Sequence, residues 1–238
     1  MKIAIAYPPL ATIKGTPLLS QNRQYQVSPF SYFIYPVVPA YAASLLKERG
    51  YEVYWLDGLA EKWNYERWLG EVKKIKPDLI FIETKTPVIK YHWEIIKNLK
   101  ELAVGNWPLV VALAGDHVTA LPKETMENCP VDFIITGGDY DFGLLSIANH
   151  LRKGEKLEAG IWFRKTQNTK YFIQNTDKFK LDHSLDELPL IDRDLTKWHL
   201  YAYKNSNFYR APGAYTMFGR DCYWGRCSFC SWTTLFPG

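Results

Sequence analysis

The sequence has few cysteines and no long hydrophobic run. No stretch reaches the roughly 18 to 20 consecutive apolar residues that cross a bilayer, and Pro8 and Pro9 interrupt the apolar N-terminus before it could serve as a signal peptide. Four cysteines in 238 residues are too few and too clustered for a disulfide framework. We therefore expect a cytoplasmic protein without a membrane span, whose cysteines serve metal or redox chemistry.

The motifs of several enzyme classes are also missing. The chain has no Walker motif, no recognisable Ser-His-Asp or paired-carboxylate motif, no internal repeat and no low-complexity tract. The net charge is only +4, and the basic stretch 151–180 is followed by an acidic one at 181–200. Such neighbouring stretches fit the solvated faces of a linker, so we expect no nucleic-acid partner.

Short apolar runs alternate with stretches of helical periodicity along residues 1–154. This alternation predicts an α/β domain with a doubly wound, five-stranded parallel sheet of the Rossmann or flavodoxin-like kind. The expected strands are 2–6, 51–56, 78–83, 109–114 and 131–135. The expected helices are 40–49, 63–76, 88–102, 122–128 and 141–152.

The pattern changes after Gly154. Residues 161–164 and 171–173 flank the turn-like segment 167–169, which predicts an exposed hairpin. A polar linker follows, with a short helix expected at about 192–199 and a strand at 215–218 that leads into a cysteine-rich segment.

In doubly wound sheets, ligands bind beyond the carboxyl ends of the strands. The loop 7–38 is far longer than an ordinary connection and carries the aromatic residues Tyr25, Phe30, Tyr32, Phe33 and Tyr35. These rings either cover a large flat ligand or pack on the sheet, and loop glycines either admit a ligand or serve tight turns. The candidate cofactor-binding residues in these loops are Pro8, Thr84, Thr86, Gly115, Asp116, His117, Val118, Thr119, Gly137, Gly138 and Asp139.

Three cysteines lie near the C-terminus with C-x4-C-x2-C spacing: Cys222, Cys227 and Cys230. Structural zinc needs four closed ligands, and the nearest histidine is His199. A plant-type 2Fe-2S cluster needs a distant fourth cysteine after the triplet, and none follows. The remaining cysteine, Cys129, precedes a core strand and is expected to be a small buried hydrophobe. A third option is a 4Fe-4S cluster held by three cysteines.

The segment Cys227-Ser228-Phe229-Cys230, with its aromatic residue before the last cysteine, resembles the radical S-adenosylmethionine superfamily. The first gap holds four residues, where that superfamily commonly has three. The resemblance implies that Cys222, Cys227 and Cys230 hold a 4Fe-4S cluster. It further implies that the open iron binds S-adenosylmethionine and cleaves it to a 5′-deoxyadenosyl radical.

The upstream sequence resembles the cobalamin-binding members of the superfamily. Residues 115–122 match their Gly-x-His-x-Thr-x-x-Pro segment, and residues 131–137 match a Val-Asp-x-Ile-x-x-Gly segment, with Gly138-Asp139 in place of the usual Gly-Glu. The Asp-x-His-x-x-Gly motif that places imidazole on cobalt is absent, so no cobalt–histidine bond is expected. His117 is then a polar contact to the corrin or a hydrogen-bond partner that fixes a loop.

The resemblance implies the N-terminal part of a cobalamin-dependent radical S-adenosylmethionine enzyme that methylates, cyclises or rearranges an unactivated carbon of a small-molecule or peptide substrate. An external one-electron donor such as flavodoxin or ferredoxin is implied as well. We expect a cobalamin-binding domain at 1–154, a hairpin and linker at 155–210 and an incomplete (β/α) barrel at 211–238, so that the chain alone is catalytically silent. The alternative is a non-enzymatic corrin- or nucleotide-binding module with a structural zinc or ferredoxin-like cysteine loop. Surface or capping roles are expected for His92, His150, His183 and His199.

Overall fold

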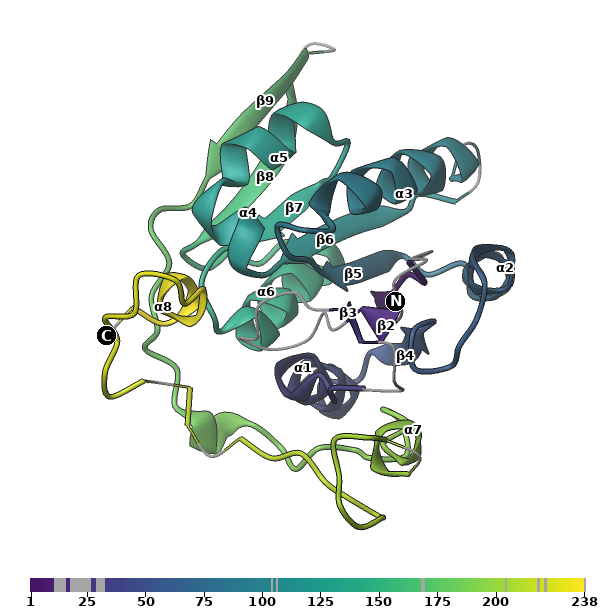
Figure 1. Cartoon of the computed structure of the whole chain (residues 1–238). Coiled ribbons are helices and arrows are strands. Elements are labelled where there is room, and N and C mark those ends of the chain that lie inside the picture. The colour runs from purple at the N-terminus through teal and green to yellow at the C-terminus, as the bar shows by residue number, and fades with distance from the viewer. Residues whose placement is uncertain are drawn as a thin grey trace.

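A parallel sheet flanked by helices forms the body of the chain (Figure 1). The computed structural model describes residues 1–10, 16–17, 27–28, 33–103, 105, 107–167, 170–203, 205–217, 219–220 and 222–237. The strands are β1 (Lys2–Tyr7), β2 (Thr16–Pro17), β3 (Val27–Ser28), β4 (Glu52–Asp57), β5 (Leu79–Glu83), β6 (Val110–Ala114), β7 (Phe133–Ile135), β8 (Ile161–Gln167) and β9 (Lys170–Asn175). The helices are α1 (Val37–Glu48), α2 (Tyr65–Ile75), α3 (Ile89–Leu102), α4 (Asp116–Ala120), α5 (Pro122–Asn128), α6 (Tyr140–Lys153), α7 (His199–Ala202) and α8 (Trp232–Leu235).

The main sheet contains the five predicted strands, which run parallel in the order β4-β1-β5-β6-β7. The expectation of a sheet with five strands only was wrong, because the hairpin β8-β9 continues the same sheet in antiparallel fashion. Ile161 of β8 lies opposite Ile135 of β7, and Phe163 lies opposite Phe133. The three residues of β7 are buried, so its free edge needs a partner strand, and β8 supplies the missing hydrogen bonds.

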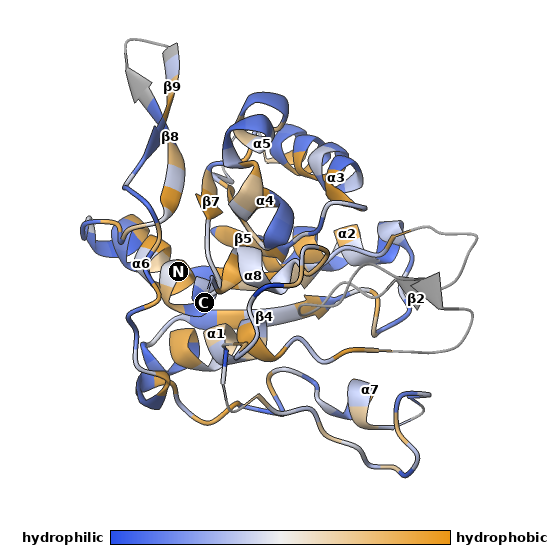
Figure 2. Cartoon of the chain, turned by 60° about the vertical axis from the view of Figure 1, so that its left-hand side comes forward, coloured by the Kyte–Doolittle hydropathy of each residue, from blue (hydrophilic) through white to orange (hydrophobic). Residues whose placement is uncertain are grey.

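Helices cover both faces of this sheet because successive side chains of a strand point to opposite sides. Ile3 and Ile5 belong to a core shared with α1 and α6, whereas Ala4 and Ala6 belong to a second core shared with α2 and α3. Figure 2 shows apolar residues concentrated in the strands and on the inner faces of the helices. In the described part of the chain, no helix combines the length and apolar character that crossing a membrane requires.

The linker after the hairpin packs against α1 and β4. The Asp192 backbone NH donates to the Ser44 hydroxyl at 2.8 Å, and the Lys47 amine contacts the Asp192 carboxylate at 2.5 Å. The Trp55 indole donates to the Tyr201 hydroxyl at 3.2 Å. These contacts, spread along residues 192–201, fix the path of the linker over the first domain.

Two predictions for the last 50 residues were wrong. The helix expected at 192–199 is a series of turns that ends in the short helix α7. Residues 215–217 form no strand, and residue 218 lies outside the described residues. A strand needs neighbouring backbone to satisfy its amides, whereas Tyr215 is held by a side-chain bond, its hydroxyl donating to the Phe33 carbonyl at 2.9 Å. The turn residues 168–169 of the hairpin are also outside the described part.

The aromatic residues of the first long loop are only partly described. Phe33 and Tyr35 are buried in the core on the α1 side. Of the two alternatives for these rings, packing within the protein therefore holds for Phe33 and Tyr35. Tyr25, Phe30 and Tyr32 lie outside the described residues.

Candidate functional site

A buried carboxylate lies at the end of β5. It belongs to the carboxyl edge of the sheet, which is the edge formed by the carboxyl ends of the parallel strands. Glu83 is 2% exposed and accepts hydrogen bonds from the hydroxyls of Tyr7 at the end of β1 and of Tyr140 at the start of α6. Burial raises the pKa of the Glu83 carboxyl above its usual range, although the neighbouring Lys85 charge lowers it. The sequence analysis missed this group, and its signal was a single acidic residue closing an otherwise apolar strand.

Two histidines fix the loop that follows β5. The Nδ1 atom of His92 lies 2.8 Å from the Thr84 hydroxyl, and the Nδ1 atom of His117 lies 3.1 Å from the Thr86 hydroxyl. Burial lowers the pKa of His92 to about 4 and also lowers that of His117, so both rings are neutral at neutral pH. His92 is fully buried, so the expectation of a surface or capping role was wrong for it. Among the described residues the buried Nε2 atom of His117 makes no hydrogen bond, and the Glu124 carboxylate lies 3.6 Å from it.

The loop after β6 contacts the neighbouring loops through its backbone. Gly115 has a φ of +123°, and a Cβ atom there would lie 2.1 Å from the Thr84 carbonyl oxygen. The Thr119 hydroxyl donates to the Gly115 carbonyl at 2.7 Å and accepts from the Gly137 amide at 3.1 Å. Val118 is buried beside them. Thr84, Gly115, Thr119 and Gly137 therefore form one continuous set of contacts along the edge.

Two further predicted residues belong to the same edge. Asp116 is the first residue of α4, and its carboxylate accepts from the His117 amide at 2.7 Å. Pro8 is buried directly after β1. Both residues thus lie at the carboxyl edge, where the order of the strands predicts them.

Aromatic rings from later in the chain fill the space next to the two glycines after β7. A Cβ atom on Gly138 would lie 2.0 Å from the Phe236 ring, and one on Gly137 would lie 2.4 Å from the Phe179 ring. Asp139, the next residue, lies 3.1 Å from the Arg220 guanidinium and 3.5 Å from the His183 ring. The space beside Gly137 and Gly138 is therefore occupied by the Phe179 and Phe236 rings of this chain.

The three clustered cysteines lie in the segment that crosses this edge. All three are free and partly exposed, and the Cys230 amide donates to the Cys227 carbonyl at 3.1 Å. Cys222 and Cys230 pack against the small apolar cluster of Trp232, Leu235 and Phe236. Within the described residues, no three His, Cys, Asp or Glu side chains converge as metal ligands. The donor set fits an iron-sulfur cluster because thiolates are its usual ligands, but the thiols would have to gather around it.

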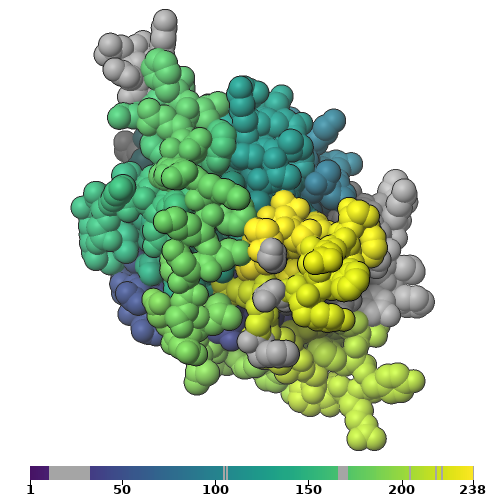
Figure 3. All heavy atoms as spheres, turned by 90° about the vertical axis from the view of Figure 1, so that its left-hand side faces the viewer, coloured from purple at the N-terminus to yellow at the C-terminus, as the bar shows by residue number. Residues whose placement is uncertain are grey.

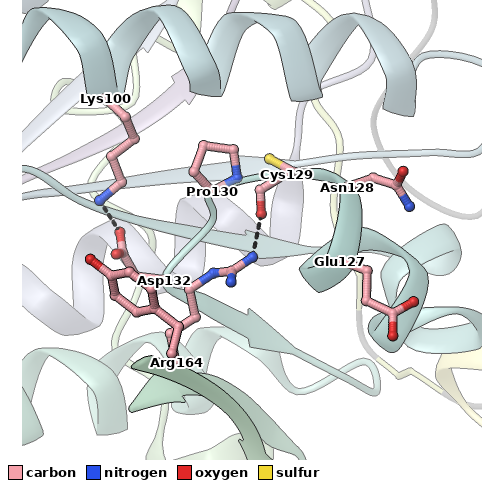
Figure 4. Close-up of a pocket in the computed structure, with 8 residues that line it drawn as sticks. Lys100, Glu127, Asn128, Cys129, Pro130, Asp132 and Arg164 are labelled. Atoms are coloured by element: carbon pink, nitrogen blue, oxygen red, sulfur yellow. Dashed lines mark hydrogen bonds and ion pairs between the residues drawn. The ribbon is translucent and has the colours of Figure 1, made fainter. Parts of the chain in front are cut away.

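The fourth cysteine lies at the opposite edge of the sheet, beside a cavity of about 520 Å³. In Figure 4, the Lys100 amine contacts the Asp132 carboxylate, and the Arg164 guanidinium donates to the Cys129 carbonyl at 2.7 Å. Burial raises the pKa of the Cys129 thiol to about 12, so this cysteine is the inert apolar residue that its sequence position predicts. Lys100 is paired with Asp132, Arg164 is hydrogen-bonded to backbone carbonyls, and the cavity lies away from the candidate site.

Known proteins resemble this chain in sequence and in fold. No protein-family model matches it. It is 27% identical over 201 residues to the uncharacterized methyltransferase PH0819 of Pyrococcus horikoshii, covering 84% of this chain and 41% of that protein. The chain therefore spans less than half the length of this relative.

Solved structures of two enzymes share the fold. The radical S-adenosylmethionine methyltransferase TsrM from Kitasatospora setae, solved with cobalamin and a [4Fe-4S] cluster, aligns with a TM-score of 0.53 at 15% identity over 79% of this chain and 30% of that one. The cobalamin-dependent S-adenosylmethionine radical enzyme OxsB, solved with aqua-cobalamin and S-adenosylmethionine, aligns with a TM-score of 0.62 at 14% identity over 85% of this chain and 25% of that one. At these identities the likeness establishes the fold, a mostly parallel α/β sheet like that of cobalamin radical enzymes.

Proposed function

We propose that this chain supplies the cobalamin-binding domain and the cluster-binding segment of a radical S-adenosylmethionine methyltransferase. The observation that carries the proposal is the position of the cysteine segment. Helix α8 packs on α4 at the carboxyl edge of the sheet, so the predicted cluster ligands lie beside the loops where α/β sheets bind cofactors. Figure 3 shows this C-terminal segment in yellow against the rest of the surface.

The fold likeness to TsrM and OxsB supports a cobalamin-dependent radical enzyme, and the names of TsrM and of the sequence relative support methyl transfer as its reaction. We assign residues 1–154 to the cobalamin-binding domain, 155–210 to the hairpin and linker, and 211–238 to the start of the radical domain. The substrate, a small molecule or a peptide, and the electron donor belong to the complete enzyme, and we propose that the chain alone is catalytically silent.

The carboxyl edge has groups that fit a corrin. The hydroxyls of Thr84, Thr86 and Thr119 are hydrogen-bonded within the chain and hold the loops of this edge in place. Gly115 brings its backbone close to the neighbouring loop. The His117 Nε2 atom is buried and makes no hydrogen bond within the described residues, although the Glu124 carboxylate lies 3.6 Å away, and such an atom suits an amide of the corrin periphery. When bound, cobalamin supplies a transferable methyl group and the cluster supplies the electron that cleaves S-adenosylmethionine.

The chain's own residues prepare this edge for a ligand. His92 and His117, both neutral, hold the Thr84-Lys85-Thr86 loop by hydrogen bonds to its two hydroxyls. Glu83 joins the ends of two neighbouring elements through Tyr7 and Tyr140. Rigid loops lower the entropic cost of binding, because little ordering remains to be done when the ligand arrives.

A titration with hydroxocobalamin tests the cofactor assignment. We expect the chain to retain the corrin after desalting. His117→Phe is expected to weaken binding about tenfold, because it removes a hydrogen bond worth roughly 1 to 1.5 kcal/mol. Lys47→Met, at an exposed position in the last turn of α1, is the control and leaves the affinity unchanged. A chain that retains no corrin would contradict the assignment, and tight zinc uptake would favour the non-enzymatic module.

A further inference from the structure

A buried arginine joins the cysteine segment to the sheet domain. Arg220 is 6% exposed, and its guanidinium faces Asp141, which is fully buried in the first turn of α6. The Nη1 atom lies 2.9 Å from Asp141 Oδ1, the Nη2 atom lies 2.5 Å from Asp141 Oδ2, and Asp139 Oδ1 lies 3.1 Å from Nη1. This is the bidentate geometry for which arginine is better suited than lysine.

Further acidic and aromatic groups surround this pair. Two carboxylates, Asp139 and Asp141, face one guanidinium, and His183 stands 3.5 Å from Asp139 on the other side. The His183 ring stacks on Phe142 with centroids 4.1 Å apart, and its Nε2 atom lies 3.4 Å from Glu158. The arginine therefore enters a prepared acidic recess that is bordered by the linker as well as by α6.

A second contact holds the same segment from its other end. The Phe236 ring fills the space at Gly138, directly before Asp139, and α8 packs on α4. The cysteines thus lie between two attachment points, Arg220 on one side and Phe236 on the other. Because a residue spans at most about 3.6 Å, the Cα atom of Cys222 lies within roughly 7 Å of that of Arg220. The ion pair therefore limits where the first thiol can lie.

We propose that Arg220 is a positioning residue that seats the cysteine segment on the carboxyl edge of the sheet through Asp141 and Asp139. A buried ion pair contributes little to net stability when compared with apolar side chains of similar shape, but its geometry specifies one arrangement. This positioning role follows from the contacts of Arg220 with Asp141 and Asp139 and does not depend on the proposed function. Its consequence for the cluster, that iron loads onto prealigned thiols, rests on the proposed function.

Thiol alkylation of the full 238-residue chain, without added metal, tests the proposal. Iodoacetamide rates are measured for each cysteine by mass spectrometry in the wild type and in the double variant Arg220→Met with Asp141→Leu. This variant removes both members of the bidentate pair and leaves Asp139 with His183 as its remaining neighbour. We expect Cys222, two positions from Arg220, to react at least about fivefold faster in the double variant, because the segment opens locally there, whereas Cys230 keeps its packing against the apolar cluster of Phe236. Cys129 reports on global folding and stays protected in both proteins.

Two further variants make the result decisive. Lys47→Met breaks an ion pair of the linker elsewhere and is expected to leave all four rates unchanged. Arg220→Lys keeps the charge but loses the paired geometry, and should give intermediate rates at Cys222. An unchanged rate at Cys222 in the double variant overturns the proposal. If Cys129 also becomes reactive in the double variant, that variant has unfolded globally and the test passes to Arg220→Lys. A Cys222 rate equal to that of the wild type in Arg220→Lys then overturns the proposal.

The outcome is independent of the proposed function. A chain that takes up no iron but shows the expected alkylation pattern retains the positioning role and loses the cluster assignment. In a chain that does take up iron, the double variant is expected to load it several-fold more slowly, with a broadened electron paramagnetic resonance signal. Equal loading rates and an unchanged signal would contradict the proposed effect of this seating on cluster assembly.

Discussion

A Cβ atom on Gly115 would lie 2.1 Å from the carbonyl oxygen of Thr84. The two residues follow neighbouring parallel strands, β6 and β5, so their loops approach closely at the edge where a cofactor is proposed to bind. The φ of +123° at Gly115 adds a backbone conformation that side chains rarely adopt. A glycine is therefore required here by space and by conformation.

Gly115→Ala is expected to reduce the free energy of unfolding by about 2 to 4 kcal/mol, because the methyl group clashes with backbone and the φ is strained. Urea unfolding followed by circular dichroism measures this loss. Gly70→Ala is the control, since Gly70 is exposed within α2 with nothing near its Cβ position, and it should stabilise by about 0.5 to 1 kcal/mol. A loss below 1 kcal/mol at Gly115 would contradict the close approach.

Glu83→Gln is expected to change how stability depends on pH. The folded-state pKa of Glu83 is raised above the ordinary 4.5, so its contribution is fully present below that pH and is lost as pH rises through the folded pKa. The variant lacks this loss. Its stability relative to the wild type should therefore increase between pH 4.5 and pH 7.5, as measured by urea unfolding. A relative stability that stays constant or falls over this range would be inconsistent with a buried carboxylate of raised pKa.

His92→Gln should act in the opposite direction. The folded-state pKa of His92 is about 4 against an ordinary 6.5, so the wild type loses stability as pH falls below 6.5 because the unfolded chain takes up the proton. Relative to the variant, the wild type should lose about 2 kcal/mol between pH 7.5 and pH 5. Thermal unfolding at the two pH values measures this difference, and equal pH profiles for the two proteins would refute it.

The sequence predicted the parallel strands and most of the helices because each short apolar run and each capped helix is a local signal. The hairpin was recognised but not its place in the sheet, since the pairing of Ile161 with Ile135 depends on tertiary contact. The strand expected around Tyr215 failed for the same reason, because no partner strand reaches it among the described residues.

The candidate site likewise contains residues that the sequence predicts and residues that it does not. Strand order alone places Thr84, Gly115 and Gly137 at one edge, so these residues could be predicted. Arg220 and Asp141 are 79 positions apart, and nothing local marks either as a partner of the other. Their pairing, like that of Tyr7 with Glu83, became visible only in the folded chain.

Iron loading of the chain tests the central claim most directly. After anaerobic reconstitution with iron and sulfide, the account predicts about four iron atoms per chain, with charge-transfer absorbance and an electron paramagnetic resonance signal on reduction. Cys222→Ala, Cys227→Ala and Cys230→Ala should each abolish them, and Cys129→Ala, at the opposite edge, should retain them. Tight zinc binding without iron uptake, or iron uptake that survives loss of the three clustered cysteines, would contradict the account.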